Sequence, residues 1–113
     1  MVTSNYVPAR GDIVWLNFDP QVGHEQAGRR PAVVLSPVAY NRKVGLALMC
    51  PVTNKKKGYP FEIEIPLDTP VSGVVLADQI KSLDWRVRQA EQACALSGNV
   101  VDQILARARL LLA

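Results

Sequence analysis

The sequence predicts a mainly β domain: a small, strongly twisted antiparallel sheet or β-barrel closed by a C-terminal helix. Two observations favour this class. Short strand-like runs alternate with turn residues as far as residue 97, and only residues 99–113 carry apolar positions at helical spacing. The chain has 113 residues and is 49% hydrophobic, so we expect one folded domain covering 1–113.

Each predicted strand has its own local signal. Residues 12–18 alternate apolar and polar side chains after Gly11, and 32–36 form a continuous β-branched run typical of a central strand. Residues 46–52 hold Pro51 near their end, where a missing N–H is tolerated. The remaining predicted strands are 61–65, 74–85 (one bent strand or two) and 92–97, and one helical turn is expected at 38–41.

The pattern of residues 99–113 predicts an amphipathic helix. Ser97 is a plausible N-cap, Asp102 lies near the positive N-terminal end, and Arg107 and Arg109 suit the C-terminal half. The apolar positions fall on one helical face: Val100, Val101, Ile104, Leu105, Ala108, Leu111 and Leu112.

Positive charge is concentrated in one part of the chain. The net charge is +3, but no Asp or Glu occurs between Gln26 and Phe61. That window holds seven of the thirteen basic residues: Arg29, Arg30, Arg42, Lys43, Lys55, Lys56 and Lys57. Such a segment creates a positive field suited to phosphates, although a solvated Lys/Arg surface is an equal alternative.

Other composition features exclude several classes. No apolar run reaches the roughly 20 residues needed to span a bilayer, and the N-terminal residues lack the apolar core of a signal peptide. We therefore expect a cytoplasmic protein with reduced thiols at Cys50 and Cys94. With one histidine, no metal-ligand cluster and no phosphate-binding glycine loop, the sequence predicts an enzyme without metal or cofactor, if it is an enzyme.

The segment "GHEQAGRRP" gathers polar groups at the junction of a loop and a strand. Arg30 precedes Pro31, so its guanidinium leaves from a rigid edge and offers a fork of donors to a phosphate. A structural pair of Glu25 with an arginine is the alternative. Thr53 ends a strand and opens a lysine-rich loop, where its hydroxyl could donate to a phosphoryl oxygen or merely cap a turn.

Two further groups are candidates for binding. Tyr59 could stack on a base, and Lys55, Lys56 and Lys57 could attract backbone phosphates or only keep the loop soluble. Asp78, Gln79 and Lys81 interrupt an apolar run, so they either support a loop from beneath or face a groove.

The ordered motifs "GDIVWLNFDP", "GHEQAGRRPAVVLSP", "YNRKVG", "CPVTNKKKGYPFE" and "VVLADQIKSLDWR" resemble the MazF/PemK toxin family of type II toxin–antitoxin systems, closest to its MazF branch. The resemblance implies an SH3-like barrel of the PemK/CcdB type acting as a homodimer. It also implies a sequence-specific endoribonuclease that cuts single-stranded RNA, mRNA in the cell, and a MazE-like antitoxin that neutralises it.

The resemblance also implies site residues. The catalytic positions of the MazF branch correspond to Arg30, Thr53 and Glu25. The PemK branch uses a His, an Arg and an Asp; His24 and Asp78 match, but Leu76 stands at the Arg position, so we place both among the binding residues. The predicted RNA-binding residues are His24, Gln26, Arg29, Asn41, Lys55, Lys56, Lys57, Tyr59, Asp78, Gln79 and Lys81.

Metal-free RNA cleavage fits these residues. The substrate's own 2′-OH attacks the phosphate, leaving a 2′,3′-cyclic phosphate and a 5′-OH, and an arginine with a hydroxyl donor stabilises the developing charge. Glu25 is the preferred base, with His24 or Arg30 as alternatives. Two other functions stay open: a CcdB-like toxin that binds gyrase without catalysis, although the "LLLA" end lacks that branch's Trp-Gly-Ile, and a nucleic-acid-binding SH3-like module.

Overall fold

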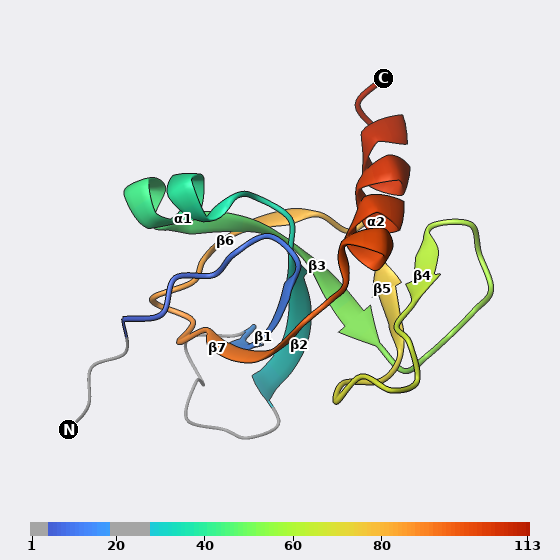
Figure 1. The fold of residues 1–113 in the computed structure, drawn as a ribbon, viewed down its shortest axis with the longest axis horizontal. Coiled ribbons are helices and arrows are strands. Elements are labelled where there is room, and N and C mark those ends of the chain that lie inside the picture. Colours follow the sequence, from blue (N-terminus) through green and yellow to red (C-terminus); the bar gives the residue numbers. More distant parts are fainter. Residues whose placement is uncertain (1–4, 19–27) are drawn as a thin grey trace.

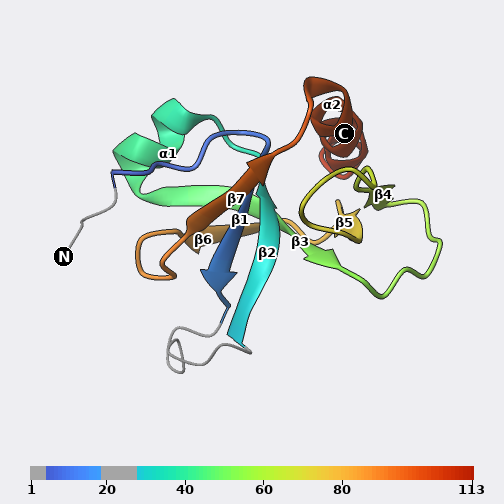
Figure 2. The same ribbon diagram turned by 60° about the horizontal axis from the view of Figure 1, so that its bottom comes forward.

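The structure, a computed structural model, describes residues 5–18 and 28–113. In this part of the chain the strands are β1 (Asp12–Asn17), β2 (Arg29–Val34), β3 (Leu46–Thr53), β4 (Glu62–Glu64), β5 (Val74–Leu76), β6 (Lys81–Asp84) and β7 (Glu91–Ala95). Helix α1 (Val38–Val44) connects β2 to β3, and α2 (Gly98–Leu110) ends the fold. The two helices lie at opposite ends of the molecule (Figures 1 and 2).

The strands form one antiparallel sheet in the order β4-β5-β3-β2-β1-β7, with β6 added to β3. The long strand β3 divides its outer edge: Leu46–Met49 pair with β6, whereas Val52 and Thr53 pair with β5. Residues 74–85 are therefore two strands rather than one bent strand. The mainly β class with a C-terminal helix is confirmed, but β4 and β7 do not pair among the described residues, so "barrel" describes the sheet's curvature only loosely.

Side-chain alternation distributes the apolar residues between the two faces of the sheet. Ile13, Val33 and Cys50 belong to a core on the face that α2 covers, whereas their strand neighbours Val14 and Val34 belong to a second core on the other face. Buried on both faces, β1 to β3 form a rigid centre from which the strand ends project.

The helices differ in detail from the expectation. Helix α2 buries Val100, Val101, Ile104 and Ala108, but it ends at Leu110, and Leu111 and Leu112 are exposed beyond the sheet. Ser97 occupies the N-cap position, and its carbonyl accepts the N–H groups of Val100 and Val101, but its side chain forms no capping hydrogen bond. Neither described helix is long and apolar enough to cross a membrane.

Helix α1 runs for seven residues rather than one turn. Gly45 ends it in the left-handed conformation, with φ of 81°, and donates its N–H to the carbonyl of Asn41 at 2.9 Å. The Asn41 side chain is fully buried beneath the helix, and this anchor holds the extra turn in place.

Strand β2 begins three residues earlier than predicted, at Arg29, and passes through Pro31. The proline is tolerated because the ladder between β2 and β3 stops beside it, at the pair Ala32↔Pro51. Pro31 and Pro51 have no N–H to donate, so at this point the two strands separate. β2 continues along β1, and β3 turns towards β5.

Candidate active site

Strands β2 and β3 separate beyond their last pair, and we call the space between the two separating ends the opening. Arg30 lies on the β2 side of it and Thr53 on the β3 side. The last β2–β3 pair is Ala32↔Pro51, and two residues further along each strand are Arg30 and Thr53. Residues opposed in an antiparallel register share a face of the sheet. Arg30 is held from behind by its pair with Leu16 of β1, and Thr53 by its pair with Val74 of β5.

The two groups are available for chemistry to different degrees. Arg30 is exposed and forms no hydrogen bond or ion pair with the residues that the structure describes. Thr53 is half-buried, and its Oγ1 accepts a hydrogen bond from the Lys55 N–H at 3.1 Å. Because the hydroxyl is used as an acceptor, its proton is left to donate. An uncommitted guanidinium and a hydroxyl donor thus lie on the same face of the two strand ends that separate beyond the pair Ala32↔Pro51.

Gly73 sets the approach of β5 to Thr53. Its φ is 124°, and a Cβ at this position would lie 2.4 Å from the Thr53 carbonyl oxygen. Any other residue would push β5 away from the end of β3. Glycine is therefore required for the position of the Thr53 backbone.

A pocket of about 180 Å³ begins at Thr53. It is lined by Thr53, Lys55, Lys57, Tyr59, Glu62, Leu76 and Gln79, which come from the end of β3, the following loop, β4 and β5 with the turn after it. Five of these seven are residues that the sequence predicted: Thr53, Lys55, Lys57, Tyr59 and Gln79. The pocket combines an aromatic ring, an amide and two cationic side chains, as a site for a nucleotide does.

Asp78 supports this pocket through its hydrogen bond with Tyr59. The Tyr59 hydroxyl donates to Asp78 Oδ1 at 2.7 Å. That hydrogen bond, with smaller contributions from desolvation and from the charges of Asp78 and Glu62, raises the pKa of Tyr59 above its usual value. The phenol therefore stays protonated and keeps its ring in one orientation beside Gln79.

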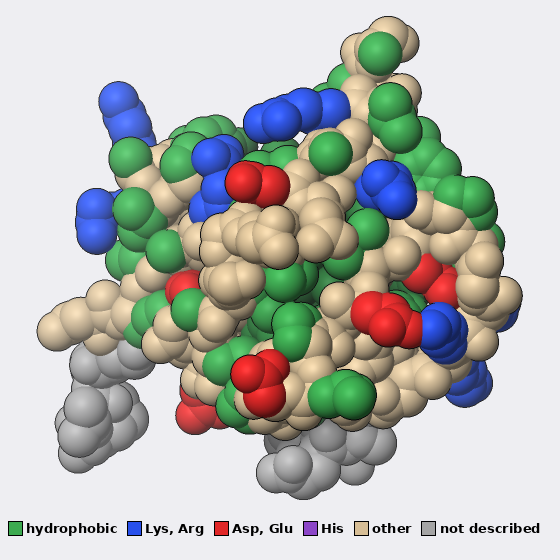
Figure 3. Space-filling view, turned by 45° about the vertical axis from the view of Figure 1, so that its right-hand side comes forward, with side chains coloured by type: hydrophobic (Ala, Val, Ile, Leu, Met, Phe, Trp, Pro, Cys, Tyr) green, Lys and Arg blue, Asp and Glu red, His purple; other side chains and the backbone are tan. Residues whose placement is uncertain are grey.

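Carboxylates of β4 hold the lysine-rich loop. Glu62 accepts the N–H groups of Lys57 and Gly58 at 2.9 and 2.8 Å, and Lys56 forms an ion pair with Glu64. Basic and acidic side chains lie in contact on the right-hand side of this face of the molecule (Figure 3). Lys56 is thus partly neutralised and does not line the pocket, whereas Lys55 and Lys57 do.

The role of Glu62 was missed from the sequence. The alternation of β4 places both Glu62 and Glu64 on its outer side, and no local signal distinguishes them. The two glutamates differ because the lysine-rich loop folds back so that two of its main-chain N–H groups donate to the Glu62 carboxylate.

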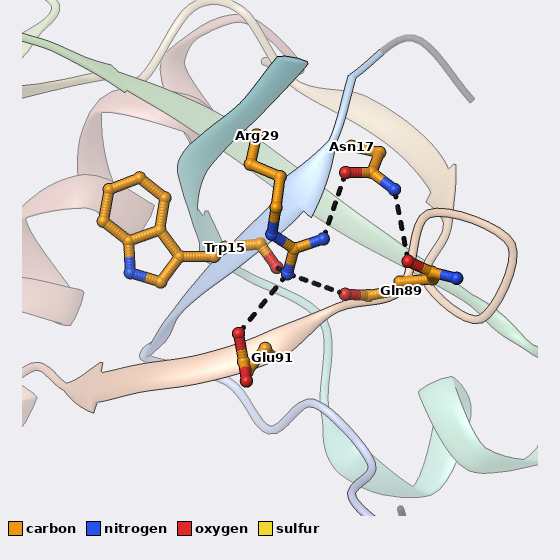
Figure 4. Close-up of polar contacts among 5 residues, drawn as sticks. All are labelled: Trp15, Asn17, Arg29, Gln89 and Glu91. Atoms are coloured by element: carbon orange, nitrogen blue, oxygen red, sulfur yellow. Dashed lines mark hydrogen bonds and ion pairs between the residues drawn. The ribbon is translucent and has the colours of Figure 1, made fainter. Parts of the chain in front are cut away.

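Arg29 is placed quite differently from its neighbour Arg30. Its guanidinium donates to Asn17 Oδ1 at 3.0 Å, to the Trp15 carbonyl at 3.2 Å and to the Gln89 carbonyl at 3.0 Å. It also lies 3.5 Å from Glu91 Oε1 (Figure 4). Arg29 therefore connects β1, β2 and the segment that leads into β7.

Asn41 lies away from the site, and its predicted contact with RNA requires correction. Its side chain is fully buried, accepts a hydrogen bond from Ser36 Oγ at 2.5 Å, and donates to the carbonyls of Pro8 and Ser36 at 2.7 and 3.0 Å. Every polar atom of the amide is occupied inside the protein. Asn41 holds α1 to the N-terminal segment and offers nothing to a ligand.

Three predicted residues, His24, Glu25 and Gln26, lie outside the described residues. Lys81 is exposed at the start of β6, opposite Met49 of β3, and does not line the pocket. Across residues 5–18 and 28–113 no group of three or more His, Cys, Asp and Glu side chains is arranged to hold a metal ion.

Comparison with known proteins identifies the family. Residues 9–112 match the model of the PemK-like, MazF-like toxins of type II toxin–antitoxin systems. The chain belongs to this family. It is 46% identical to the endoribonuclease toxin MazF of Escherichia coli (strain K12) over 111 residues, which cover 98% of this chain and 99% of that protein.

Solved structures of the family superpose closely on this fold. A crystal structure of MazF from Deinococcus radiodurans is 56% identical, covers 96% of this chain and 98% of its own, and has a TM-score of 0.86. A MazE–MazF structure from the same organism is 50% identical and also has a TM-score of 0.86, with 96% of this chain and 97% of that chain covered. The sequence resemblance to the MazF/PemK family is thereby confirmed.

Proposed function

We propose that this chain is an endoribonuclease toxin that cleaves single-stranded RNA, mRNA in the cell, at a short sequence and without a metal ion. Relatives of nearly full length that are named endoribonuclease toxins support the activity. The observation that carries the proposal is the arrangement of Arg30 and Thr53 across the opening between β2 and β3, beside a pocket with lysine and aromatic side chains.

The reaction begins with the substrate's 2′-OH. Its oxygen attacks the adjacent phosphorus, the O2′–P bond forms, and the bond from phosphorus to the 5′-oxygen breaks. The 2′-OH proton passes to a base, and a protonated group or a water molecule gives a proton to the leaving 5′-oxygen. The products are a 2′,3′-cyclic phosphate and a 5′-OH.

Arg30 and Thr53 serve the phosphate in this scheme. The guanidinium of Arg30 has no partner among the described residues, so it can give two parallel hydrogen bonds to phosphate oxygens. Thr53 donates a hydrogen bond through its hydroxyl proton to one of the two non-bridging oxygens as charge develops there. Glu25 is the proposed base, and His24 and Gln26 are proposed RNA contacts.

The pocket provides the binding contacts. Lys55 and Lys57 attract backbone phosphates, the Tyr59 ring stacks on a base, and Gln79 reads a base edge with its amide. Asp78 fixes the Tyr59 ring, and Lys56 and Lys81 add weaker long-range attraction. Arg29 and Asn41 are left out of this set because their side chains are engaged within the protein.

The partners follow from the family. Related crystal structures from Deinococcus radiodurans contain MazE together with MazF, so we propose a MazE-like antitoxin for this chain. An acidic segment of such an antitoxin would compete with RNA for the same positive pocket. We further propose that the protein is a single domain, 1–113, that works as a cytoplasmic homodimer.

The test uses labelled single-stranded RNA in buffer with EDTA. The protein should cut it to cyclic-phosphate and 5′-OH ends, and an RNA with a 2′-deoxy sugar at the cut site should stay intact. Arg30→Ala should lower kcat/KM by a factor of about 1,000. Arg109→Ala is the matched control, because it removes one exposed positive charge from the far helix.

Three results would count against the proposal. Loss of cleavage in EDTA would indicate a metal enzyme. Cleavage by Arg30→Ala at the wild-type rate would move the site elsewhere. Intact RNA together with trapped gyrase–DNA complexes would favour the non-catalytic alternative. Primer extension on a long RNA would then define the recognised sequence.

A further inference from the structure

The start of β2 is supported on one side only. Between Arg29 and Pro31 the strand pairs with β1, but its ladder with β3 begins only at Ala32. Among the residues that the structure describes, the backbone that carries Arg30 therefore has no second strand beside it. The position of this backbone depends on the ladder with β1 and on the hydrogen bonds of the Arg29 side chain.

The contacts of Arg29 supply that missing support. Its Nη2 donates to the main-chain carbonyls of Trp15 and Gln89, and its Nη1 donates to the side chain of Asn17 (Figure 4). Both Nη2 hydrogens are thus used by carbonyl acceptors, and Glu91 lies 3.5 Å away as a counter-charge. This guanidinium has few donors left for a phosphate.

The turn between β6 and β7 presents an acceptor to the Arg29 guanidinium. Gln89 has a φ of 55°, which is unusual for a residue other than glycine and directs its carbonyl in a fixed way. Arg88 donates to the carbonyls of Asn17 and Phe18, and its own carbonyl accepts the Asn17 N–H at 2.9 Å. The turn between β6 and β7 thus holds the end of β1 and the start of β2 together.

We propose that Arg29 is a positioning residue: it fixes the start of β2 so that Arg30, on the opposite face of the same strand, meets the scissile phosphate. This inference rests on the proposed endoribonuclease function. It replaces the expectation from sequence that Arg29 contributes general attraction for phosphate.

Two substitutions separate the roles. Arg29→Lys keeps the charge but loses the forked donor geometry, whereas Arg29→Met loses both. Positioning predicts that both lower kcat by a similar factor, about 10- to 100-fold, because a small displacement of a catalytic group is costly. KM and the salt dependence of kcat/KM should stay as in the wild type.

A phosphate contact predicts another pattern. Arg29→Lys would then resemble the wild type, and Arg29→Met would raise KM and flatten the salt dependence. Either that pattern or wild-type kcat in both variants overturns the inference. A wild-type protein that does not cut RNA at all would instead refute the proposed function, so the two failures are distinguishable.

Asn17 provides an independent pair of variants in case the Arg29 variants do not fold. Asn17→Ala removes the acceptor for Arg29 and should lower kcat, whereas Asn17→Asp keeps an acceptor oxygen and should restore most of it. Glu91→Gln is the control: this carboxylate is 75% exposed, so kcat should change by less than about twofold. Equal kcat in the two Asn17 variants would overturn the inference as well.

Discussion

Gly73 allows a quantitative test of how the fold positions Thr53. The residue lies just before β5 with a φ of 124°, a region that side chains other than glycine avoid. In Gly73→Ala the new Cβ would lie 2.4 Å from the Thr53 carbonyl oxygen and 3.1 Å from Asn54 Oδ1. The nearest atom belongs to the backbone, so β5 and the end of β3 must move apart.

Two contributions make up the expected loss of stability. The backbone conformation alone costs about 1–3 kcal/mol for alanine. Separating β5 from β3 weakens the short ladder at Val52↔Val75 and Thr53↔Val74, at about 1 kcal/mol for each hydrogen bond lost. We expect Gly73→Ala to lower the free energy of unfolding by about 3 kcal/mol, and Tm by roughly 10 °C.

Gly58→Ala is the matched control for the backbone contribution. Gly58 has a φ of 82°, but no atom of the described residues, its chain neighbours apart, lies within 4 Å of a Cβ built there. It should lose only about 1 kcal/mol, the cost of a left-handed conformation. A loss in Gly73→Ala that clearly exceeds the loss in Gly58→Ala therefore supports a contribution from the contact of β5 with Thr53.

Urea unfolding followed by circular dichroism gives both values, and RNA cleavage per folded molecule gives the effect on Thr53. Gly73→Ala should be the slower enzyme because its Thr53 is displaced. If both glycine variants lose the same free energy, or if Gly73→Ala loses less than about 1 kcal/mol, the proposed role of Gly73 is wrong.

Two further predictions concern the core. Asn41→Ala should lower the free energy of unfolding by about 3 kcal/mol, because it leaves the Pro8 carbonyl without its donor and the Ser36 hydroxyl proton without its acceptor. The cleavage rate per folded molecule should stay unchanged. A thermal melt and a rate assay check both values, and a selective loss of RNA affinity would restore the predicted RNA contact of Asn41. Burial, with a smaller contribution from Asp78, raises the pKa of Cys50 to about 12. The unfolded thiol ionises near pH 9, so stability should fall above that pH by up to about 1.4 kcal/mol per unit, and Cys50→Ala should fall less steeply; equal slopes in urea titrations would contradict this.

The positions of several strands along the chain could be predicted because the signals are local. Alternation and turn residues predict β1, β3 and β4 within one or two residues, and the spacing of Val100, Val101 and Ile104 predicts the buried face of α2. Leu111 and Leu112 continue that spacing but lie beyond the sheet they would cover. Periodicity identifies the apolar face of a helix, but it does not show where the sheet that covers this face ends.

The site was only partly predictable because the surroundings of its side chains depend on residues that are far apart in the sequence. Residue types and family motifs identify Thr53, Tyr59 and Gln79, and the structure gathers these around one pocket. The different surroundings of Arg29 and Arg30 depend on strand pairs and turns more than fifty residues away in sequence, such as Gln89. No local pattern carries that information.

The central claim is that Arg30 and Thr53 act on one phosphate across the opening between β2 and β3. Single-turnover cleavage rates of Arg30→Ala, Thr53→Val and the double variant test it most directly. Groups that act as a unit lose activity non-additively, so the double variant should be about as slow as the slower single variant. Losses that multiply in full would show that the two residues act independently, and would contradict the account.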